Sequence, residues 1–156
     1  MRISVIGSGS PSEEAAAHAR EVGRLLAERG HTVVCGGLCG VMEAACRGAR
    51  EEGGETIGIL PTDRLADANP YVTTPIATGM GNARNVLVVL NGQGVIAVSG
   101  ATGTLSELGH ALDFGRPVAG LGTHELTLEG FEAVGTPEEA VESVERRVQG
   151  DAPHRQ

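Results

Sequence analysis

The chain contains no lysine and no tryptophan, and only one tyrosine and two phenylalanines occur among its 156 residues. The absence of lysine excludes mechanisms that need its amine, including a Schiff base with pyridoxal phosphate and the phosphate-binding lysine of a P-loop. We interpret the all-arginine basic set as a codon or surface-charge bias. The scarcity of aromatic side chains means that the core must be built from valine, leucine, isoleucine and alanine.

Cysteine is also scarce: Cys35, Cys39 and Cys46 are the three in the chain, so a disulfide framework is not expected. No histidine lies at zinc-site spacing from them, so we predict no metal site and interpret them as small buried thiols. The sequence shows neither a signal-peptide layout nor an apolar run of membrane-spanning length. We therefore expect a cytoplasmic protein with no membrane partner.

The formal net charge is −8, which argues against nonspecific binding to nucleic acid or to anionic membranes. The length fits one domain, which we place at residues 1–149, followed by a frayed tail at 150–156. Glycine is abundant, with 24 residues, but it occurs in turns between apolar segments and not in repeats. Low-complexity disorder is therefore not expected.

Short apolar runs alternate along the chain with segments of helical periodicity. The expected strands are residues 3–6, 32–35, 56–60, 76–78, 95–98 and 117–121. The expected helices are residues 11–29, 41–50, 82–90, 104–114 and 136–148. For the first helix we expect a capping box, with Ser10 as the N-cap, Pro11 at the first position and Glu13 as its acidic partner.

The segment 61–75 contains three prolines and no clear period, so we expect a loop. Strands that alternate with helices indicate a parallel sheet covered on both faces. The predicted fold is therefore a Rossmann-like doubly wound α/β domain with three α/β/α layers. In such sheets ligands bind at the carboxyl ends of the strands, where the glycine-rich turns of this chain lie.

The most informative turn is residues 100–104, which connects an apolar strand to a helix. The unpaired N–H groups of a helix N-terminus favour an anion, and glycine lets a phosphate approach the backbone closely. Glu107 lies one turn into the helix, where two interpretations stay open. Its carboxylate could take part in catalysis, or it could form a capping box with Thr104.

The first glycine turn, formed by Gly7, Ser8 and Gly9, matches half of a dinucleotide-binding fingerprint. Ser12 stands where the third glycine would fall, and no acidic residue ends the second strand, so a standard NAD site is disfavoured. Phosphate contact by this turn and a purely structural tight turn remain equally open.

The second glycine turn contains Gly36, Gly37 and Gly40, and it indicates either ligand contact or close packing of a helix against a strand, with ligand contact slightly favoured. Arg84 lies in the first turn of the expected helix 82–90, where a cation is disfavoured but an anionic ligand is welcome. This position favours a phosphate or carboxylate partner over the alternative, a surface salt bridge.

Three motifs together give the chain a family resemblance: Gly36-Gly37 with residues 40–44, then residues 79–85, and residues 100–107. Over residues 1–121 the sequence resembles the LOG-like superfamily, long mislabelled "lysine decarboxylase", and looks closest to a small branch similar to molybdenum-cofactor carrier proteins. LOG enzymes hydrolyse the N-glycosidic bond of a nucleoside 5′-monophosphate, releasing base and ribose 5-phosphate. The resemblance implies that Arg84 and Glu107 form a catalytic pair. It also implies that the phosphate is held by Gly100, Thr102, Gly103 and Thr104.

The sequence departs from the LOG pattern at three positions. Ser99 stands in place of proline, Ala101 in place of the second glycine, and Asn85 in place of the lysine that follows the arginine. These changes fit a protein that binds a phosphorylated nucleotide-like or pterin-like molecule without turnover, with LOG-type phosphoribohydrolase activity as the alternative. No cofactor is expected to be required, and the bound molecule would be a nucleoside monophosphate or molybdenum cofactor. The resemblance further implies a homodimer or higher homo-oligomer.

Overall fold

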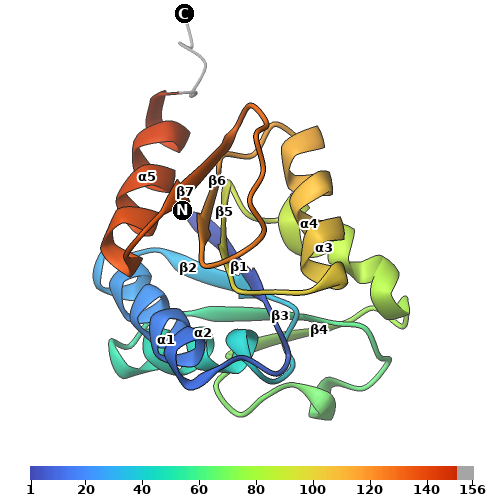
Figure 1. Ribbon diagram of the computed structural model, residues 1–156. Coiled ribbons are helices and arrows are strands. Elements are labelled where there is room, and N and C mark those ends of the chain that lie inside the picture. The colour runs from blue at the N-terminus through green and yellow to red at the C-terminus, as the bar shows by residue number, and fades with distance from the viewer. Residues whose placement is uncertain (151–156) are drawn as a thin grey trace, which may run out of the picture.

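The computed structural model describes residues 1–150 and contains one sheet of seven strands in the order β4-β3-β2-β1-β5-β6-β7. Every neighbouring pair of strands is parallel (Figure 1). The strands are β1 Arg2–Gly7, β2 Thr32–Cys35, β3 Thr56–Leu60, β4 Thr74–Ala77, β5 Gly94–Val98, β6 Val118–Leu121 and β7 Phe131–Val134. This architecture confirms the predicted Rossmann-like α/β fold.

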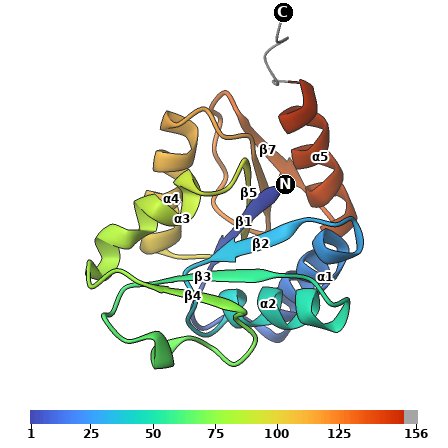
Figure 2. The ribbon, with the colours of Figure 1, turned by 180° about the vertical axis from the view of Figure 1, so that it is seen from behind.

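Within residues 1–150, five α-helices cover the two faces of the sheet, with α1, α2 and α5 on one side and α3 and α4 on the other (Figures 1 and 2). They are α1 Glu13–Glu28, α2 Val41–Glu51, α3 Asn85–Leu90, α4 Thr102–Asp113 and α5 Pro137–Gly150. Successive side chains of β1 point to opposite faces, so Val5 joins the core under α1, α2 and α5, whereas Ile6 joins the core under α3 and α4. As the composition predicts, aliphatic residues build both cores.

The first helix begins later than predicted. Ser12, not Ser10, is the N-cap of α1, and its hydroxyl accepts a hydrogen bond from the Ala15 N–H at 3.1 Å. Pro11 therefore precedes the cap, and Glu13 is the first helical residue and not the capping-box partner. The serine directly before two acidic residues is the better cap because Glu13 and Glu14 then lie in the positive first turn of the helix.

The middle of the chain is also more structured than predicted. A 3₁₀ turn, Leu65–Asp67, interrupts the expected loop 61–75, and β4 already begins at Thr74. This strand includes Pro75, which is tolerated because β4 is an edge strand. The expected helix 82–90 is divided into a 3₁₀ turn, Gly81–Arg84, and the short helix α3.

The C-terminal third contains one unpredicted strand, β7, which pairs with β6 at the sheet edge. At the start of the last helix the Thr136 hydroxyl accepts a hydrogen bond from the Glu139 N–H at 3.2 Å, as an N-cap side chain does. The predicted frayed tail, 150–156, falls outside the described residues except for Gly150, which is the last residue of α5. No helix within residues 1–150 combines the length and apolar character needed to cross a membrane.

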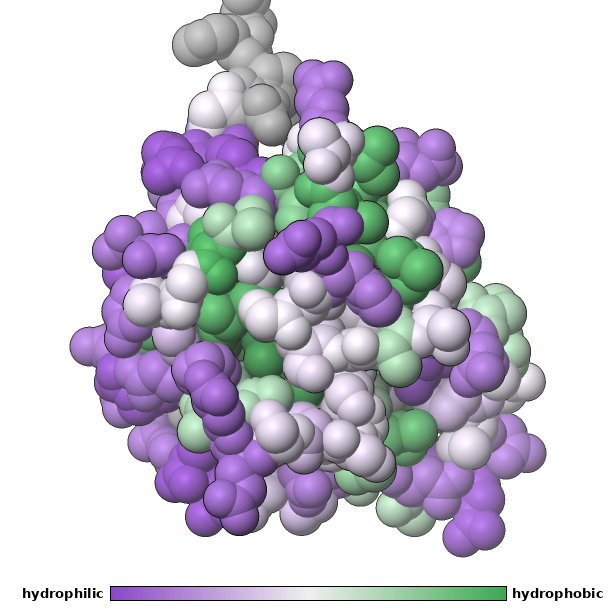
Figure 3. Space-filling model, viewed as in Figure 1, coloured by the Kyte–Doolittle hydropathy of each residue, from purple (hydrophilic) through white to green (hydrophobic). Residues whose placement is uncertain are grey.

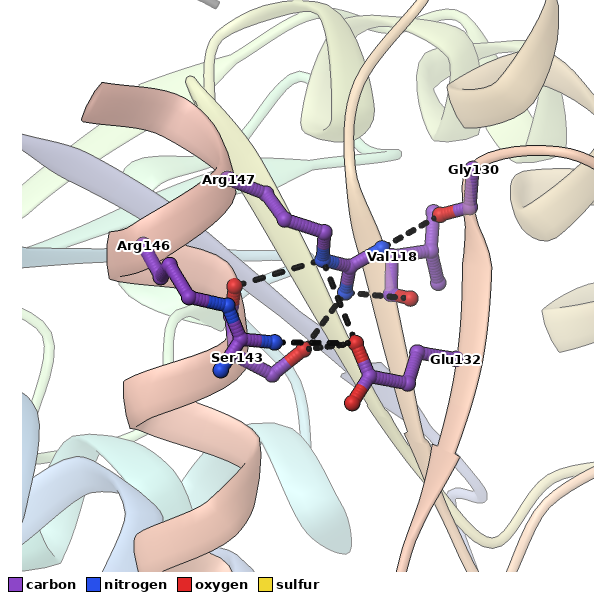
Figure 4. A network of polar contacts seen from close by, with 6 residues as sticks. All are labelled: Val118, Gly130, Glu132, Ser143, Arg146 and Arg147. Carbon is purple, nitrogen blue, oxygen red and sulfur yellow. Dashed lines mark hydrogen bonds and ion pairs between the residues drawn. The ribbon is translucent and has the colours of Figure 1, made fainter. Parts of the chain in front are cut away.

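Arg147 of α5 fastens the β7 edge to the rest of the sheet (Figure 4). Its guanidinium donates to the carbonyl oxygens of Gly130 at 2.8 Å and Val118 at 2.9 Å, just before and within the paired strands. Ser143 accepts at both its carbonyl and its hydroxyl, and Glu132 completes the network with an ion pair at 3.6 Å. One side chain thus connects α5 to the start of β6 and to the residue before β7.

The outer sides of α1 and α5 carry many of the charges of the molecule, and that flank is mostly hydrophilic in Figure 3. Arg24, for example, pairs with Glu21 at 2.7 Å and with Glu28 at 3.0 Å along α1. These are exposed helical pairs, each of which contributes only a few tenths of a kcal/mol, about 0.3–0.5. The flank is therefore a solvated surface, and the chemistry must be sought elsewhere.

Candidate functional site

The site lies where the sheet order reverses, between β1 and β5. The chain leaves β1 toward α1 on one face and leaves β5 toward α4 on the other, so the carboxyl ends of these two strands diverge. Doubly wound sheets bind ligands in the crevice at this switch point. A cavity of about 270 Å³ opens here.

Eight of the eleven predicted site residues line this cavity, although they come from four separate stretches of the sequence. They are Gly7, Ser8, Gly9, Gly36, Arg84, Gly103, Thr104 and Glu107. Met42, Asn82, Asn85 and Ala101 also line it and were not predicted. Asn82 and Asn85 belong to the same motif as Arg84, residues 79–85, so that motif could have identified them as candidate site residues.

Three predicted residues do not line the cavity. Gly37 has a φ of +76° and its N–H donates to the Cys35 Sγ, so it fixes the backbone of the second turn without lining the cavity. Gly100 has a φ of +132°, and a Cβ there would lie 2.5 Å from the Thr104 side chain. Thr102 is the exposed first residue of α4.

Among the glycines of the three turns, two contrasting pairs stand out. A Cβ at Gly7 would lie 2.1 Å from the Val98 carbonyl oxygen, and one at Gly40 would lie 2.4 Å from the Ser8 carbonyl oxygen. These positions need glycine because backbone packs against backbone. Gly9 and Gly103, in contrast, have nothing within 4 Å of an added Cβ, so they leave open space beside the cavity.

The first turn of α4 forms one wall of the cavity. The helix begins at Thr102, two residues earlier than predicted, and no side chain in the described part of the chain caps its N-terminus. Ala101, Gly103 and Thr104 all line the cavity, so uncapped backbone N–H groups lie beside it. An uncapped helix start with glycine in its first turn is suited to an anion.

Arg84 is buried, with 7% of its surface exposed, so the alternative of a surface salt bridge is wrong. Its Nε donates to the Ile59 carbonyl oxygen at 2.9 Å and its Nη2 to the Gly36 carbonyl oxygen at 3.3 Å. Its Nη1 donates to the Asn85 Oδ1. Three protein acceptors thus hold the guanidinium, and Asn85, which stands where LOG enzymes carry lysine, is one of them.

Glu107 is 9% exposed, and within residues 1–150 its carboxylate has no hydrogen-bond or ion-pair partner. The capping-box interpretation is therefore wrong, because α4 begins at Thr102 and places Glu107 in its second turn. Burial raises the pKa of Glu107 to about 7, against the opposing effect of the Arg84 charge. Desolvation also lowers the pKa of Arg84, and the nearby carboxylate opposes that shift.

The cysteines divide into a buried pair and an exposed thiol. Cys35 and Cys46 are fully buried, with their sulfur atoms 3.4 Å apart. Cys39 is exposed, so the expectation of a third buried thiol is wrong. Within the described part of the chain, no group of three or more histidine, cysteine or acidic side chains is placed to hold a metal ion.

Comparison with known proteins reveals close relatives. A protein from Archaeoglobus fulgidus, described as uncharacterized, is 45% identical over 141 residues, which cover 90% of this chain and 92% of that protein. The molybdenum cofactor binding protein from Rippkaea orientalis is similar in structure, with a TM-score of 0.89 and 33% identity over 94% of this chain and 96% of that one.

The molybdenum cofactor carrier protein from Chlamydomonas reinhardtii matches with a TM-score of 0.86 and 30% identity, over 96% of this chain and 99% of that one. The sequence profile of the SLOG cluster4 family matches residues 1–148. These matches confirm the resemblance to the LOG-like superfamily and to its carrier-like branch. The chain belongs to the SLOG cluster4 family.

Proposed function

We propose that this protein binds and carries a phosphorylated, pterin-like or nucleotide-like small molecule of the molybdenum cofactor type, without turning it over. The observation that carries the proposal is the cavity at the switch point, which combines an uncapped helix start with a buried carboxylate that has no protein partner among residues 1–150. The similarity to two molybdenum cofactor proteins supports the choice of ligand class.

In this proposal the phosphate lies between the N-terminus of α4 and the first glycine turn, which is formed by Gly7, Ser8 and Gly9. Gly103 and Gly9 leave the space for its oxygens, and Thr104 and Ser8, which both line the cavity, supply hydroxyl groups. The backbone of Gly7 and Gly100 sets the turns at this position. Because the chain as a whole carries a net charge of −8, the attraction for the anion must be local and must come from N–H groups and the helix dipole.

The heterocycle would then face Arg84 and Glu107. Both side chains line the cavity, and Glu107 can donate or accept a hydrogen bond near neutral pH because its pKa is about 7. Pterin and purine edges carry both donors and acceptors, so a carboxyl group that can do either suits them. We also propose that the protein acts as a homo-oligomer and needs no resident cofactor.

Hydrolysis is the second candidate, and the raised pKa of Glu107 favours it. A carboxylate without a partner could activate water or stabilise an oxocarbenium-like sugar, as in glycoside cleavage generally. Against this, Asn85 adds no positive charge and holds Arg84 by its amide oxygen, so the guanidinium is engaged by the protein. This arrangement favours binding over turnover.

The test begins with turnover. The pure protein is incubated with AMP and a panel of other nucleoside 5′-monophosphates, and free base and ribose 5-phosphate are measured. We expect no release above a control without protein, together with thermal stabilisation by molybdenum cofactor released from a molybdoenzyme. Release of base that disappears in Glu107→Gln would overturn the carrier proposal in favour of the hydrolase.

Binding is tested with the same probes and matched variants. Glu107→Gln should weaken binding of the cofactor, whereas Glu138→Gln, a change at an exposed glutamate in the first turn of α5, should leave binding unchanged. If neither cofactor nor any nucleotide stabilises the wild-type protein, the ligand class proposed here is wrong.

A further inference from the structure

We propose that Cys35 and Cys46 form a reversible dithiol–disulfide pair beneath the ligand cavity, and that closing the disulfide displaces the support of Arg84. This inference goes beyond the binding function and does not depend on which ligand the cavity holds. It rests on three features: the distance between the two sulfur atoms, the groups around Cys35, and the position of Cys35 next to the cavity wall.

The two thiols are close and enclosed. Cys35 is the last residue of β2 and Cys46 lies in the middle of α2, and their sulfur atoms are 3.4 Å apart in hydrogen-bonding contact. A disulfide bond needs about 2.05 Å, so the two sulfur atoms must approach by about 1.3 Å for the bond to close. Both side chains are fully buried, so either thiol meets the other before it meets a second protein molecule.

The surroundings of Cys35 favour its thiolate. The hydrogen bond with Cys46 lowers the pKa of Cys35 and burial opposes this effect; the Gly37 N–H and the Arg84 charge lower the pKa further, whereas the Glu107 charge raises it. The Gly37 N–H donates to the Cys35 sulfur at 3.3 Å. The pKa of Cys46 is raised by the same hydrogen bond and by burial. We assign Cys35 as the nucleophile of the pair because the Gly37 N–H and the Arg84 charge both stabilise negative charge on its sulfur, and the thiolate is the reactive form.

The chemistry balances with hydrogen peroxide as the oxidant. The Cys35 thiolate attacks one peroxide oxygen, the O–O bond breaks, and Cys35 becomes a sulfenic acid while water leaves after protonation. Cys46 then attacks the Cys35 sulfur, the S–S bond forms, and the S–O bond breaks with loss of a second water. The two thiols are oxidised together by two electrons, and peroxide is reduced to two molecules of water. A dithiol reductant reverses the reaction by thiol–disulfide exchange.

The link to the cavity is direct. Gly36 follows Cys35 in the chain, lines the cavity, and accepts a hydrogen bond from Arg84 through its carbonyl oxygen. An added Cβ on Gly36 would lie 2.7 Å from both the Arg84 Nη2 and the Met42 sulfur, so both side chains pack directly on this residue. We therefore expect a shift of Cys35 toward α2 to move the Gly36 carbonyl oxygen and, with it, Arg84.

The pairing is tested by peptide mapping. The protein is treated with hydrogen peroxide, free thiols are alkylated in denaturant, and the digest is analysed by mass spectrometry. We expect a Cys35–Cys46 linkage that dithiothreitol removes, in the wild type and equally in Cys39→Ser. Alkylation of both Cys35 and Cys46 after treatment, with oxidation confined to exposed Cys39, would overturn the proposal.

A second variant tests the order of events, and a spectroscopic signal tests the link to the cavity. In Cys46→Ser, Cys35 should be trapped as a sulfenic acid that dimedone labels, and absence of this label would overturn the assignment of Cys35 as the nucleophile. In ¹⁵N-labelled wild-type protein, the Arg84 Nε–H resonance should shift on oxidation and return on reduction. An unchanged resonance in protein with the mapped disulfide would overturn the link to Arg84.

Discussion

The Arg84 guanidinium donates a hydrogen bond to the Gly36 carbonyl oxygen at 3.3 Å, although 48 residues separate the two. The same nitrogen lies 2.7 Å from where a Cβ on Gly36 would stand. Glycine at position 36 and arginine at position 84 therefore depend on each other. Two motifs that are far apart in sequence form one wall of the cavity.

Substitution Gly36→Ala should destabilise the protein and disturb the cavity at once. The new methyl group must push aside Arg84 or Met42, and overpacking of this kind costs about 1–3 kcal/mol. Chemical denaturation measures the loss of unfolding free energy. Gly9→Ala is the matched control, because a Cβ there meets nothing within 4 Å, and an equal loss in both variants would contradict the packing argument.

Substitution Gly103→Ala should separate stability from binding. It lies in the first turn of α4 with open space around it, so alanine should leave the protein as stable or up to about 1 kcal/mol more stable. The methyl group would occupy the space proposed for the phosphate, so binding of molybdenum cofactor should fall. Calorimetric titration beside thermal unfolding checks this, and tighter or unchanged binding would argue against a phosphate at Gly103.

Glu107 should make stability depend on pH. Its pKa is raised in the folded protein to about 7, above the usual 4.5, so the folded state holds this proton more tightly than the unfolded state. The stability that Glu107 contributes is therefore fully present below about pH 4.5 and is lost as the pH rises through 7. Glu107→Gln cannot ionise, so it should gain roughly 1–3 kcal/mol relative to wild type at pH 8 but not at pH 4.5. Chemical denaturation at both pH values measures the unfolding free energies. The same difference between variant and wild type at pH 8 and at pH 4.5 would contradict the raised pKa.

Arg84→Ala should be strongly destabilising. It removes the donors to the Ile59 and Gly36 carbonyl oxygens, and each buried acceptor without a partner costs about 1–3 kcal/mol. It should also raise the pKa of Glu107 further, because the opposing positive charge is lost. Carboxyl-carbon NMR titration of Glu107 tests the second effect. Arg84→Lys, which keeps the charge but not the fork of donors, should lose stability while shifting that pKa less.

Arg147→Lys should loosen the β7 edge and leave the cavity intact. A lysine keeps the charge but cannot serve Gly130, Val118 and Ser143 together, so we expect a loss of about 1–3 kcal/mol. Hydrogen exchange should accelerate in residues 131–134 and stay slow in β1. Uniform acceleration across the whole sheet would show that Arg147 supports global stability and not this edge.

The sequence by itself determined the class of fold and the three turns, because both depend on local patterns. Apolar runs between helical periods indicate buried parallel strands, and glycine clusters between a strand and a helix indicate tight turns. Element ends were less well determined, since Ser10 and Ser12 are both suitable cap residues, and Ser12 is the N-cap in the structure because Glu13 and Glu14 then lie in the first turn of α1. The edge strand β7 was missed because its side chains are half-buried or exposed and its position depends on pairing with β6 and on Arg147.

Only the tertiary structure decided between the alternatives at Arg84 and Glu107. Sequence spacing allowed Glu107 to cap its own helix and allowed Arg84 to form a surface ion pair. The choice between the alternatives depends on burial, which is set by residues that are far away in the chain. The Ile59 and Gly36 carbonyl oxygens hold Arg84, and Glu107 lines the cavity at the β1–β5 switch point. A local pattern specifies which groups are present, but their charge state and partners follow from the desolvation that the assembled fold imposes.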